Sequence, residues 1–313
     1  MGFTEKSLIA AVRRSAGSGS PIALGIGDDS AIVRIPAGHE ALVTTDFSLE
    51  GIHFRREWHP PESVGHRCLA RGLSDIAAMG GVPVACFLSL ALPKTTPVVW
   101  VRRFTKGLLS LSRKFGVILA GGDTAQSPAG ILADIVVLGS VERGQALRRS
   151  GAKPGDVLYV TGSLGSSAHV LKLLFAHPKR RPRSAVSAAH FFPQPRLDVG
   201  RFLAGKRLAT AMIDISDGLS TDLPHICEES RVGAVIEAES IPRAKGVSLD
   251  CALNGGDDYE LLFTAPAGRT VPKAIHGVPV TRIGKITRGR SVLLFQGGDT
   301  SHLNPAGWQH FTK

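Results

Sequence analysis

Residues 117–124 read VILAGGDT, an apolar run that ends in two glycines, an aspartate and a threonine. A short run of this kind is typical of a buried strand, and the residues that close it are typical of a turn or a ligand-binding loop. Helix-like stretches separate it from further runs of the same kind, so the sequence predicts an α/β or α+β fold. The other predicted strands are ALVTTD at 41–46, ADIVVLGSV at 133–141, VLYVTG at 157–162 and AMIDISDG at 211–218.

One helix carries a candidate functional residue. Between residues 62 and 79 the apolar side chains recur at helical spacing, and the sequence GGVP at 80–83 ends the pattern. This predicts a helix with Asp75 near its C-terminal end, where the helix dipole disfavours a carboxylate. Asp75 therefore needs a nearby cation, which is either Arg71 one turn earlier or a metal ion.

The polar stretch RRSGAKPGD at 148–156 is rich in turn-forming residues and is followed by a new predicted strand. It is the best candidate for a domain boundary in a chain of 313 residues, which is long enough for two domains. We therefore expect an N-terminal domain at 1–147 and a C-terminal domain at 148–313.

The composition is that of a globular protein without a membrane span or a zinc site. With 43% hydrophobic and 20% charged residues, the chain is neither disordered nor fibrous. The longest apolar run, at 82–93, has 12 residues, whereas a membrane helix needs about 20, and the N-terminus lacks a signal-peptide pattern. The four cysteines form no C-x-x-C pair, so we expect buried thiols, no disulfide framework and a cytoplasmic location.

The chain is basic, with 37 Lys and Arg residues against 26 Asp and Glu residues and a formal charge of +11. Most basic residues stand in isolated pairs, and the dense run PKRRPR at 178–183 is typical of a solvated loop. Aromatic residues do not alternate with the basic ones, and a recognition-helix pattern is absent. We expect neither a nucleic-acid partner nor a membrane partner.

Although acids are the minority, many recur in one setting, after an apolar run and among glycine, serine or threonine. Carboxylate, hydroxyl and carbonyl oxygens are the ligands of hard cations such as Mg²⁺ or Mn²⁺, and several clusters imply several ions. A turn is the alternative for each cluster taken singly, because Asp beside Gly is common in turns. The clusters are GIGDDS with Asp28 and Asp29, TTDF with Asp46, LSD with Asp75, GGDT with Asp123, DISDG with Asp214 and Asp217, and GGDDYE with Asp257 and Asp258.

The common nucleotide-binding motifs are absent from the sequence. There is no G-x-x-x-x-G-K-[ST], Ser30 replaces the third glycine that a G-x-G-x-x-G would need, and the protein-kinase motifs H-R-D and D-F-G are missing. Without a motif lysine, metal ions have to neutralise bound phosphates. The repulsion is large, since two unit charges about 4 Å apart interact by roughly 4 kcal/mol at an effective dielectric near 20.

As a set, these motifs resemble those of the thiamine-monophosphate kinases, in the ATP-binding superfamily of aminoimidazole-ribonucleotide synthetase and selenophosphate synthetase. The resemblance runs from FTEKSLI near the start to PAGWQHF near the end. It implies two α/β domains, a homodimer formed by the N-terminal sheet, and direct in-line transfer of the γ-phosphoryl of ATP to thiamine monophosphate with several Mg²⁺ ions. The motifs that carry it are GIGDD, TTDFSLEGIHF, LSDIAAMG, GGDT, ALRRSGAKPGD, IDISDGL, GGDDYELLFT and GW.

The resemblance also implies roles for individual residues, and none of them is a catalytic base. The family pattern has GGEDYE where this chain has GGDDYE, so Asp257 is one methylene shorter than the residue it replaces. The implied metal ligands are Asp29, Thr44, Thr45, Asp46, Asp75, Asp123, Asp214 and Asp217; the implied nucleotide contacts are Gly122, Asp123, Arg149 and Ser216; and the implied substrate contacts are His53, Asp257 and Trp308.

Structural roles are the alternatives for some of these residues. His53 is then an ordinary loop or core histidine, Arg149 a surface arginine like its neighbour Arg148, and Trp308 a packing residue. Other members of the superfamily fit the sequence less well. A selenophosphate synthetase needs a cysteine in the first thirty residues, and this chain has none there. A hydrogenase-maturation relative should end in cysteine, whereas this chain ends in Lys313. The motifs TTDFSLEGIHF and GW oppose a cyclo-ligase.

Overall fold

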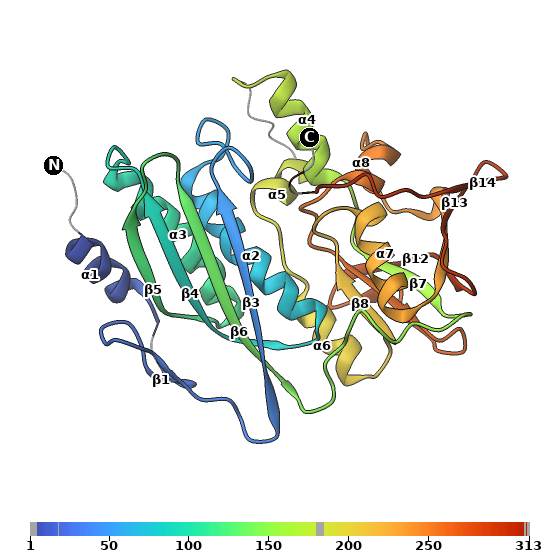
Figure 1. Cartoon of the computed structure of the whole chain (residues 1–313), viewed down its shortest axis with the longest axis horizontal. Coiled ribbons are helices and arrows are strands. Elements are labelled where there is room, and N and C mark those ends of the chain that lie inside the picture. Colours follow the sequence, from blue (N-terminus) through green and yellow to red (C-terminus); the bar gives the residue numbers. More distant parts are fainter. Residues whose placement is uncertain (1–4, 18, 180–184, 310, 312–313) are drawn as a thin grey trace. The chain divides into compact units, whose positions relative to one another are not determined.

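The computed structural model describes residues 5–17, 19–179, 185–309 and 311, and the chain divides into two units (Figure 1). Unit 1 comprises Met1–Ile76 and Val82–Arg143, and unit 2 comprises Ala77–Gly81 and Gly144–Lys313. The division follows Arg143, whereas the sequence predicts a boundary after residue 147. Most of the basic run at 178–183 lies outside the described residues.

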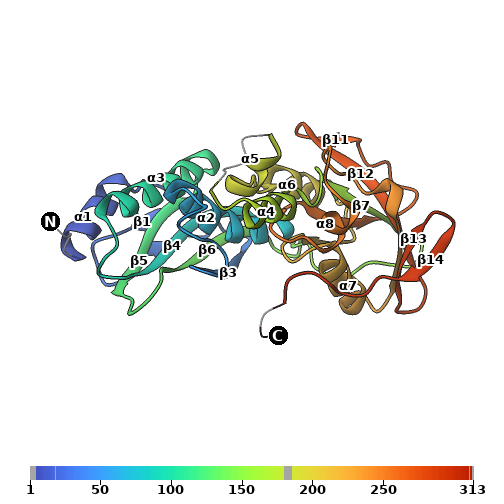
Figure 2. The ribbon, with the colours of Figure 1, turned by 90° about the horizontal axis from the view of Figure 1, so that it is seen from above.

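Unit 1 is built on a sheet of strand order β3-β6-β4-β5, with α2 and α3 on one face (Figure 2). Strand β6 runs antiparallel to both β3 and β4, while β4 and β5 are parallel and are connected through α3. In chain order the elements are α1 (Glu5–Ser15), β1 (Ile22–Leu24), β2 (Ile32–Val33), β3 (His39–Leu49), α2 (Pro61–Ala78), β4 (Val82–Leu92), α3 (Val98–Phe115), β5 (Ile118–Gln126) and β6 (Leu132–Glu142).

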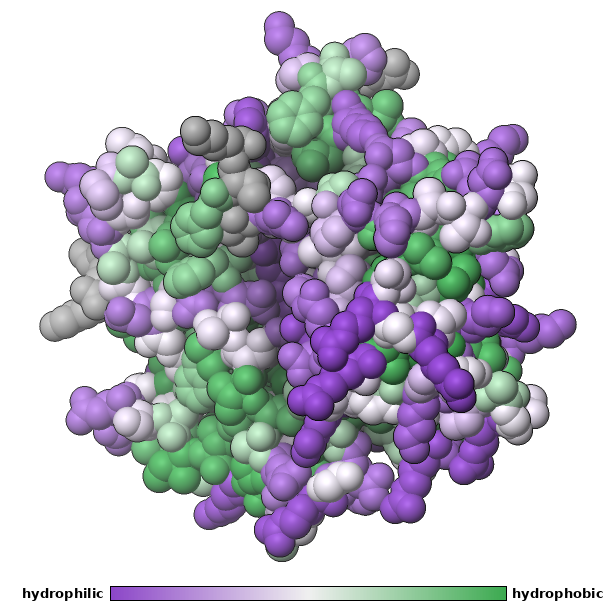
Figure 3. Space-filling view, turned by 45° about the vertical axis from the view of Figure 1, so that its right-hand side comes forward, coloured by the Kyte–Doolittle hydropathy of each residue, from purple (hydrophilic) through white to green (hydrophobic). Residues whose placement is uncertain are grey.

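The burial of each strand follows its place in this sheet. The apolar run at 82–93 forms β4, which lies between two other strands and is mostly buried on both faces. Strand β3 lies at an edge, and its side chains alternate between the helix-covered face and the other face, which we call the outer face. Val43 and Phe47 on the outer face are 68% and 56% exposed. Figure 3 shows hydrophobic side chains gathered over the lower left of its view, on the side where Figure 1 draws this sheet.

Helices α2 and α3 cross where each of them carries a glycine. A Cβ atom on Gly65 would lie 2.0 Å from the carbonyl oxygen of Phe104, and a Cβ atom on Gly107 would lie 1.9 Å from that of Glu62. Both distances are too short for any side chain, so the two helix backbones approach each other directly. The glycines therefore permit a helix contact that no other residue type allows at these positions.

Unit 2 contains a larger sheet of strand order β14-β13-β9-β12-β7-β10-β8, with β11 paired to β12. Its pairs are antiparallel except for β13 and β9. The elements are β7 (Val157–Thr161), α4 (Ser166–Ala176), α5 (Ala185–Phe191), α6 (Leu197–Gly205), β8 (Ala211–Asp214), α7 (Leu219–Ser230), β9 (Gly233–Glu237), the 3-10 helix η1 (Ala238–Ser240), α8 (Leu249–Asn254), β10 (Leu261–Ala265), β11 (Ala274–Ile275), β12 (Val278–Thr287), β13 (Val292–Gln296) and β14 (Asp299–His302).

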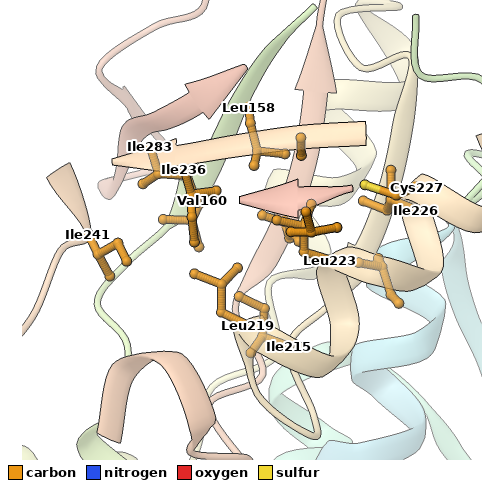
Figure 4. Close-up of a cluster of buried hydrophobic side chains, with 14 of the residues drawn as sticks. Leu158, Val160, Ile215, Leu219, Leu223, Ile226, Cys227, Ile236, Ile241 and Ile283 are labelled. Carbon is orange, nitrogen blue, oxygen red and sulfur yellow. The ribbon is translucent and has the colours of Figure 1, made fainter. Parts of the chain in front are cut away.

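The core of unit 2 forms between this sheet and α7. Leu219, Leu223 and Ile226 lie on one face of α7 and contribute to a buried cluster with Val160 and Ile236 of the sheet (Figure 4). Their spacing of three and four residues is the helical period that places side chains on one face. Helix α7 is thereby packed on the sheet.

The cysteines behave as the sequence predicts, since all four are buried and none is in a disulfide. Burial raises the pKa of the Cys68 and Cys227 thiols to about 12, so they stay protonated at neutral pH. Among the described residues, the helices are all too short or too polar to cross a membrane.

We expect Gly107→Ala to lower the free energy of unfolding by about 1–3 kcal/mol, because the new methyl group would overlap the backbone of α2. Gly205→Ala is the matched control, since a Cβ atom on Gly205 meets no described atom within 4 Å. Urea unfolding followed by circular dichroism measures both variants. Equal stability of the two variants would contradict the direct backbone contact.

Candidate functional site

The first candidate site is a cavity of about 540 Å³ in unit 1. The GIGDDS loop and the next residue contribute Gly25–Ala31 to its lining, and β5 contributes Leu119–Thr124. Asp29, Gly122 and Asp123 are far apart in the sequence and line this one cavity. Two of the predicted acidic clusters therefore meet here.

Gly122 is required at this cavity by the backbone. Its φ angle is +149°, and a Cβ atom on it would lie 1.9 Å from the carbonyl oxygen of Leu88 on β4. Any side chain would collide with the neighbouring strand, so the glycine of GGDT brings the main chain of β5 and β4 close together.

The acids at the cavity also bind the backbone next to them. Asp28 Oδ1 accepts the amide hydrogen of Asp29 at 2.9 Å, and Asp123 Oδ1 accepts that of Thr124 at 2.8 Å. Each bond uses part of a carboxylate that can accept several, so a local structural role and a ligand role are compatible. Thr124 Oγ1 is buried and forms no hydrogen bond with any residue that the structure describes. The cavity thus presents hard oxygen donors.

A second group of oxygens lies between β3 and α2. Thr44 and Asp46 are two residues apart on β3 and share the helix-covered face, and Thr44 Oγ1 donates a hydrogen bond to Asp75 Oδ2 on α2. Gly72 of α2 faces the sheet here, and a Cβ atom on it would lie 2.6 Å from Val137 Cγ2. The glycine lets α2 bring Asp75 down to the strand.

Thr45 points the other way. It lies on the outer face of β3, where its hydroxyl donates to Asp134 Oδ1 of β6 at 2.7 Å. Arg71, the alternative partner for Asp75, donates from Nη1 to the carbonyl oxygen of Phe47 at 3.0 Å. The structure therefore groups Thr44, Asp46 and Asp75, and it does not bring the Thr45 hydroxyl to them.

The two groups of unit 1 lie toward opposite edges of the sheet. Asp46 pairs with Ile135, Ile135 with Leu88, and Leu88 with Gly122, which makes three steps between strands. At about 4.8 Å a step, Asp46 and Gly122 are about 14 Å apart. Within the described parts of the chain, no three or more His, Cys, Asp or Glu side chains are arranged to hold a metal ion together.

In unit 2 the loop between β8 and α7 is held by Asp222. Asp222 Oδ2 accepts the backbone N–H groups of Ser216, Asp217 and Gly218 at 3.0–3.1 Å. Burial and the charge of Asp217 raise the pKa of Asp222 to about 7, while the amide hydrogen bonds act in the opposite direction. Asp214, the last residue of β8, is buried beside this loop.

Two other segments bind the same loop through their backbones. The Asp257 N–H donates to the carbonyl oxygen of Ser216 at 2.7 Å, and the Trp308 N–H donates to that of Asp217 at 3.0 Å. Gly307 permits the second contact, because a Cβ atom on it would lie 2.1 Å from the Asp217 carbonyl oxygen. The structure therefore brings Ser216, Asp217, Asp257 and Trp308 together within unit 2. The Trp308 side chain is 49% exposed, so half of it is accessible to a ligand.

His53 lies just after β3 in unit 1, and its loop is anchored. Its Nδ1 accepts the amide hydrogen of Leu49 at 3.0 Å, so a neutral ring carries its proton on Nε2. Glu50 fixes the loop, because its two carboxylate oxygens accept from Arg56 Nε at 2.5 Å and from the Ile131 N–H at 2.9 Å. His53 therefore presents Nε2–H as a donor.

Arg149 lies at the far end of α7 from the loop that Asp222 holds. Its carbonyl oxygen accepts the hydroxyl of Ser230, the last residue of α7, at 3.0 Å. A helix of 12 residues is about 18 Å long, so the Arg149 backbone is not close to Ser216. Arg148 and Arg149 are both exposed.

Three acids with clear structural roles were missed in the sequence. Asp134 is a charged residue within the otherwise apolar strand β6, and this is the sequence signal that could have identified it. Asp222 stands in the first turn of α7, where a carboxylate often binds free amides. Glu260 is buried against Arg196, whose Nε lies 2.7 Å from Glu260 Oε2, and it accepts the Thr161 hydroxyl at 2.6 Å. Nothing in the sequence distinguishes Glu260 from an exposed glutamate.

Comparisons with known proteins agree over both units. The sequence matches the AIR synthase related protein N-terminal domain over residues 27–141 and the corresponding C-terminal domain over residues 153–295. Thiamine-monophosphate kinase from Synechococcus elongatus is 38% identical over 302 residues, 91% of each chain. The enzyme from Escherichia coli K12 is 37% identical over 306 residues, 93% of this chain and 92% of its own. The chain belongs to the thiamine-monophosphate kinase family.

Solved structures of the thiamine-monophosphate kinase family have the same fold. The Stenotrophomonas maltophilia thiamine-monophosphate kinase aligns with a TM-score of 0.83 at 35% identity, over 96% of this chain and 99% of its own. AaThiL complexed with AMPPCP and TMP aligns with a TM-score of 0.79 at 32% identity, over 98% and 97%. The hydrogenase maturation protein HypE, at 18% identity and a TM-score of 0.79, shares the fold alone. The predicted family and fold class are confirmed.

For this member of the thiamine-monophosphate kinase family, we expect the contribution of Asp222 to the free energy of unfolding in EDTA to fall as the pH rises from about 4 to about 7. The folded protein holds a proton on Asp222 up to about pH 7, whereas the unfolded chain loses it near the ordinary value of 3.8. Asp222→Asn removes this titration. The difference in free energy of unfolding between the wild-type protein and Asp222→Asn should change by a few kcal/mol over this pH range, because one pKa unit corresponds to about 1.4 kcal/mol.

Urea unfolding at about pH 5 and about pH 8 measures this difference. Asp299→Asn, at an exposed position of β14, is the control and should follow the wild-type protein at both pH values. Parallel pH curves for wild type and Asp222→Asn would mean that Asp222 is ionised throughout.

Proposed function

We propose that this protein transfers the γ-phosphoryl group of ATP to the phosphate of thiamine monophosphate, giving thiamine diphosphate and ADP. The observation that carries the proposal is the cavity of unit 1, where Asp29 meets Gly122 and Asp123. Membership of the thiamine-monophosphate kinase family over both units supports the substrate. The likeness to AaThiL, solved with AMPPCP and TMP, supports both ligands.

Mg²⁺ is the metal we propose, and the donor groups suit it. Mg²⁺ prefers oxygen and usually takes one or two protein carboxylates, with water and phosphate oxygens completing its shell. Asp29 and Asp123 at the cavity, and Thr44 and Asp75 between β3 and α2, are oxygen donors of this kind. When bound, Mg²⁺ neutralises phosphate charge. The proposed ligands are Asp29 and Asp123 at the cavity, Thr44, Asp46 and Asp75 between β3 and α2, and Asp214 and Asp217 in unit 2; Thr45 stays a prediction that its side-chain geometry does not support.

The acceptor needs no base from the protein. A phosphate monoester has a second pKa near 6, so its oxygen is already an anion at neutral pH. That oxygen attacks the γ-phosphorus in line, the bond from the γ-phosphorus to the bridging oxygen breaks, and ADP leaves. No covalent enzyme intermediate forms. The protein binds the two substrates, orients them for the transfer and excludes water.

The proposed ligand contacts follow the geometry of each unit. His53 offers Nε2–H to an anion or ring nitrogen, and the Asp257 carboxylate suits the cationic thiazolium. Trp308 offers an indole for stacking on a cationic aromatic ring. For the nucleotide we propose contacts with Gly122, Asp123 and Ser216. Arg149 is exposed and its backbone lies at the other end of α7 from Ser216, so a nucleotide contact by Arg149 stays a prediction.

The deciding experiment is one incubation of the purified protein with ATP, Mg²⁺ and thiamine monophosphate. Chromatography should detect thiamine diphosphate and ADP in equal amounts. Parallel incubations with unphosphorylated thiamine and with EDTA are the controls, and neither should yield product. Product from thiamine but not from thiamine monophosphate would overturn the proposed acceptor.

We expect Asp46→Asn and Asp75→Asn each to reduce kcat by orders of magnitude while the fold stays intact, because each removes a charge that holds Mg²⁺. Steady-state kinetics over a range of Mg²⁺ concentrations measure the effect, and circular dichroism checks the fold. Asp299→Asn is the matched control and should retain full activity. Near-normal kcat in either variant would remove that residue from the proposed ligands.

We expect Trp308→Ala to raise the KM for thiamine monophosphate roughly 3–30-fold and to change the KM for ATP much less, because stacking and cation–π attraction are lost. Phe175→Ala removes another exposed aromatic ring of unit 2 and should leave both constants unchanged. Equal increases in the two KM values for Trp308→Ala would favour a packing role.

We also propose a homodimer formed through the outer face of the unit 1 sheet. Val43 and Phe47 on β3 are exposed there, and Val136 and Phe87 lie in the row of Thr45, which runs between the rows of Val43 and Phe47. A monomer in water rarely exposes a large apolar patch, so a second copy is a suitable cover. The proposed cytoplasmic location is supported by the four unpaired thiols, and the absence of a nucleic-acid partner stays a prediction.

We expect Phe47→Arg to shift the protein toward monomers, because a charge would be buried in the dimer interface. Size-exclusion chromatography with light scattering measures the mass over a series of protein concentrations. Val99→Arg, on the exposed side of α3, is the control and should stay dimeric. A monomeric wild-type protein at micromolar concentration would refute the dimer.

A further inference from the structure

The Tyr259 hydroxyl donates a hydrogen bond to Asp257 Oδ1 at 2.6 Å, two residues earlier in the chain. The backbone that allows this contact is unusual, because φ is +63° at Asp257 and +52° at Tyr259. Positive φ is uncommon for residues other than glycine, and for a bulky aromatic residue it marks a constrained loop. The two side chains are therefore held together by a specific local conformation.

Backbone hydrogen bonds maintain this conformation. The N–H of Asp257 donates to the Ser216 carbonyl oxygen at 2.7 Å, and the N–H of Tyr259 donates to that of Ile215 at 2.8 Å. Gly256 lets the segment approach, because a Cβ atom on it would lie 2.4 Å from the Ser216 oxygen. The loop of Asp257 is thus fixed on the loop that carries Ser216.

The other acids of GGDDYE have structural partners inside unit 2. Asp258 Oδ2 accepts the Gly165 N–H at 2.6 Å at the start of α4, and burial raises the pKa of Asp258 well above its ordinary value. Glu260 is 4% exposed and pairs with Arg196. Asp257 and Asp258 are both half-buried as residues, but the carboxyl group of Asp258 is buried against Gly165, so we take the Asp257 carboxylate as the acid of this motif that meets a ligand.

We propose that Tyr259 is a positioning residue that orients the Asp257 carboxylate toward the cationic ring of thiamine monophosphate, an inference that rests on the proposed function. Tyr259 is 2% exposed, so its hydroxyl comes from a packed side chain with little freedom to move. An aspartate has two side-chain torsions, and a hydrogen bond to one carboxylate oxygen restricts both. The carboxylate is then ordered before the substrate binds, which reduces the entropy lost on binding.

The test is a double-mutant cycle with Tyr259→Phe and Asp257→Asn. Tyr259→Phe keeps the ring and removes the hydroxyl, and we expect the KM for thiamine monophosphate to rise about 3–10-fold while kcat and the KM for ATP change less than about twofold. Calorimetric titration with thiamine monophosphate should show the same weakening. In the Asp257→Asn background, Tyr259→Phe should add less than about twofold. Tyr159→Phe, the other tyrosine of the chain, is the control and should match wild type.

Three outcomes would overturn the proposal. Additive effects in the double variant would mean that Tyr259 does not act through Asp257. Equal increases in both KM values, or a large drop in melting temperature for Tyr259→Phe, would assign it a purely structural role. Wild-type kinetics in Tyr259→Phe would refute positioning while leaving the kinase activity intact. Failure of the proposed function is distinct, because the wild-type protein would then form no thiamine diphosphate.

Discussion

Three consecutive amides, those of Ser216, Asp217 and Gly218, point at a single buried oxygen of Asp222. Amides at a helix start have no partners within the helix, and burying them without an acceptor would cost far more than the bonds contribute. By accepting all three, Asp222 holds the loop after β8, in which the carbonyl oxygens of Ser216 and Asp217 accept hydrogen bonds from other segments. The segments carrying Asp257 and Trp308 bind to those carbonyl groups, so the unit 2 site depends on this one carboxylate.

The two units build their sites by different means. In unit 1, glycines allow strands and helices to approach closely, and the oxygens of Asp29, Asp123, Asp46 and Asp75 project from regular elements or the turns beside them. In unit 2, the site is an assembly of loops joined by backbone hydrogen bonds. Sites on regular elements are set by sheet register, whereas loop sites need anchors of their own, such as Asp222.

Much of the fold could be predicted because strand and helix periods are local properties. The expected strands at 41–46 and 133–141 lie within β3 and β6, and the expected helix at 62–79 is α2. The stretch AMIDISDG is a strand only to Asp214, because the amides that follow donate to Asp222 instead of to a neighbouring strand. The end of the strand therefore depends on a residue of the next helix, which a local pattern does not contain.

The sequence predicted which residue types form the site better than it predicted which way their side chains point. Recurring acids beside glycine identified the cavity residues Asp29 and Asp123, yet a set of motifs does not say which side chains face each other. The alternation of a strand already separates Thr44 from Thr45, a physical signal that the motif TTD conceals. The position of Arg149 could not be inferred, because it depends on how the chain packs against the end of α7.

The glycine crossing of α2 and α3 has a mechanical consequence. With no side chains between the backbones of Gly65 and Gly107 and their neighbours, there is no soft layer in which one helix could slide along the other. We expect the two helices to move together, with Asp75 on α2. A ligand that pulls on Asp75 has to displace the whole helical layer or leave it at rest, which makes this half of the protein a stiff platform.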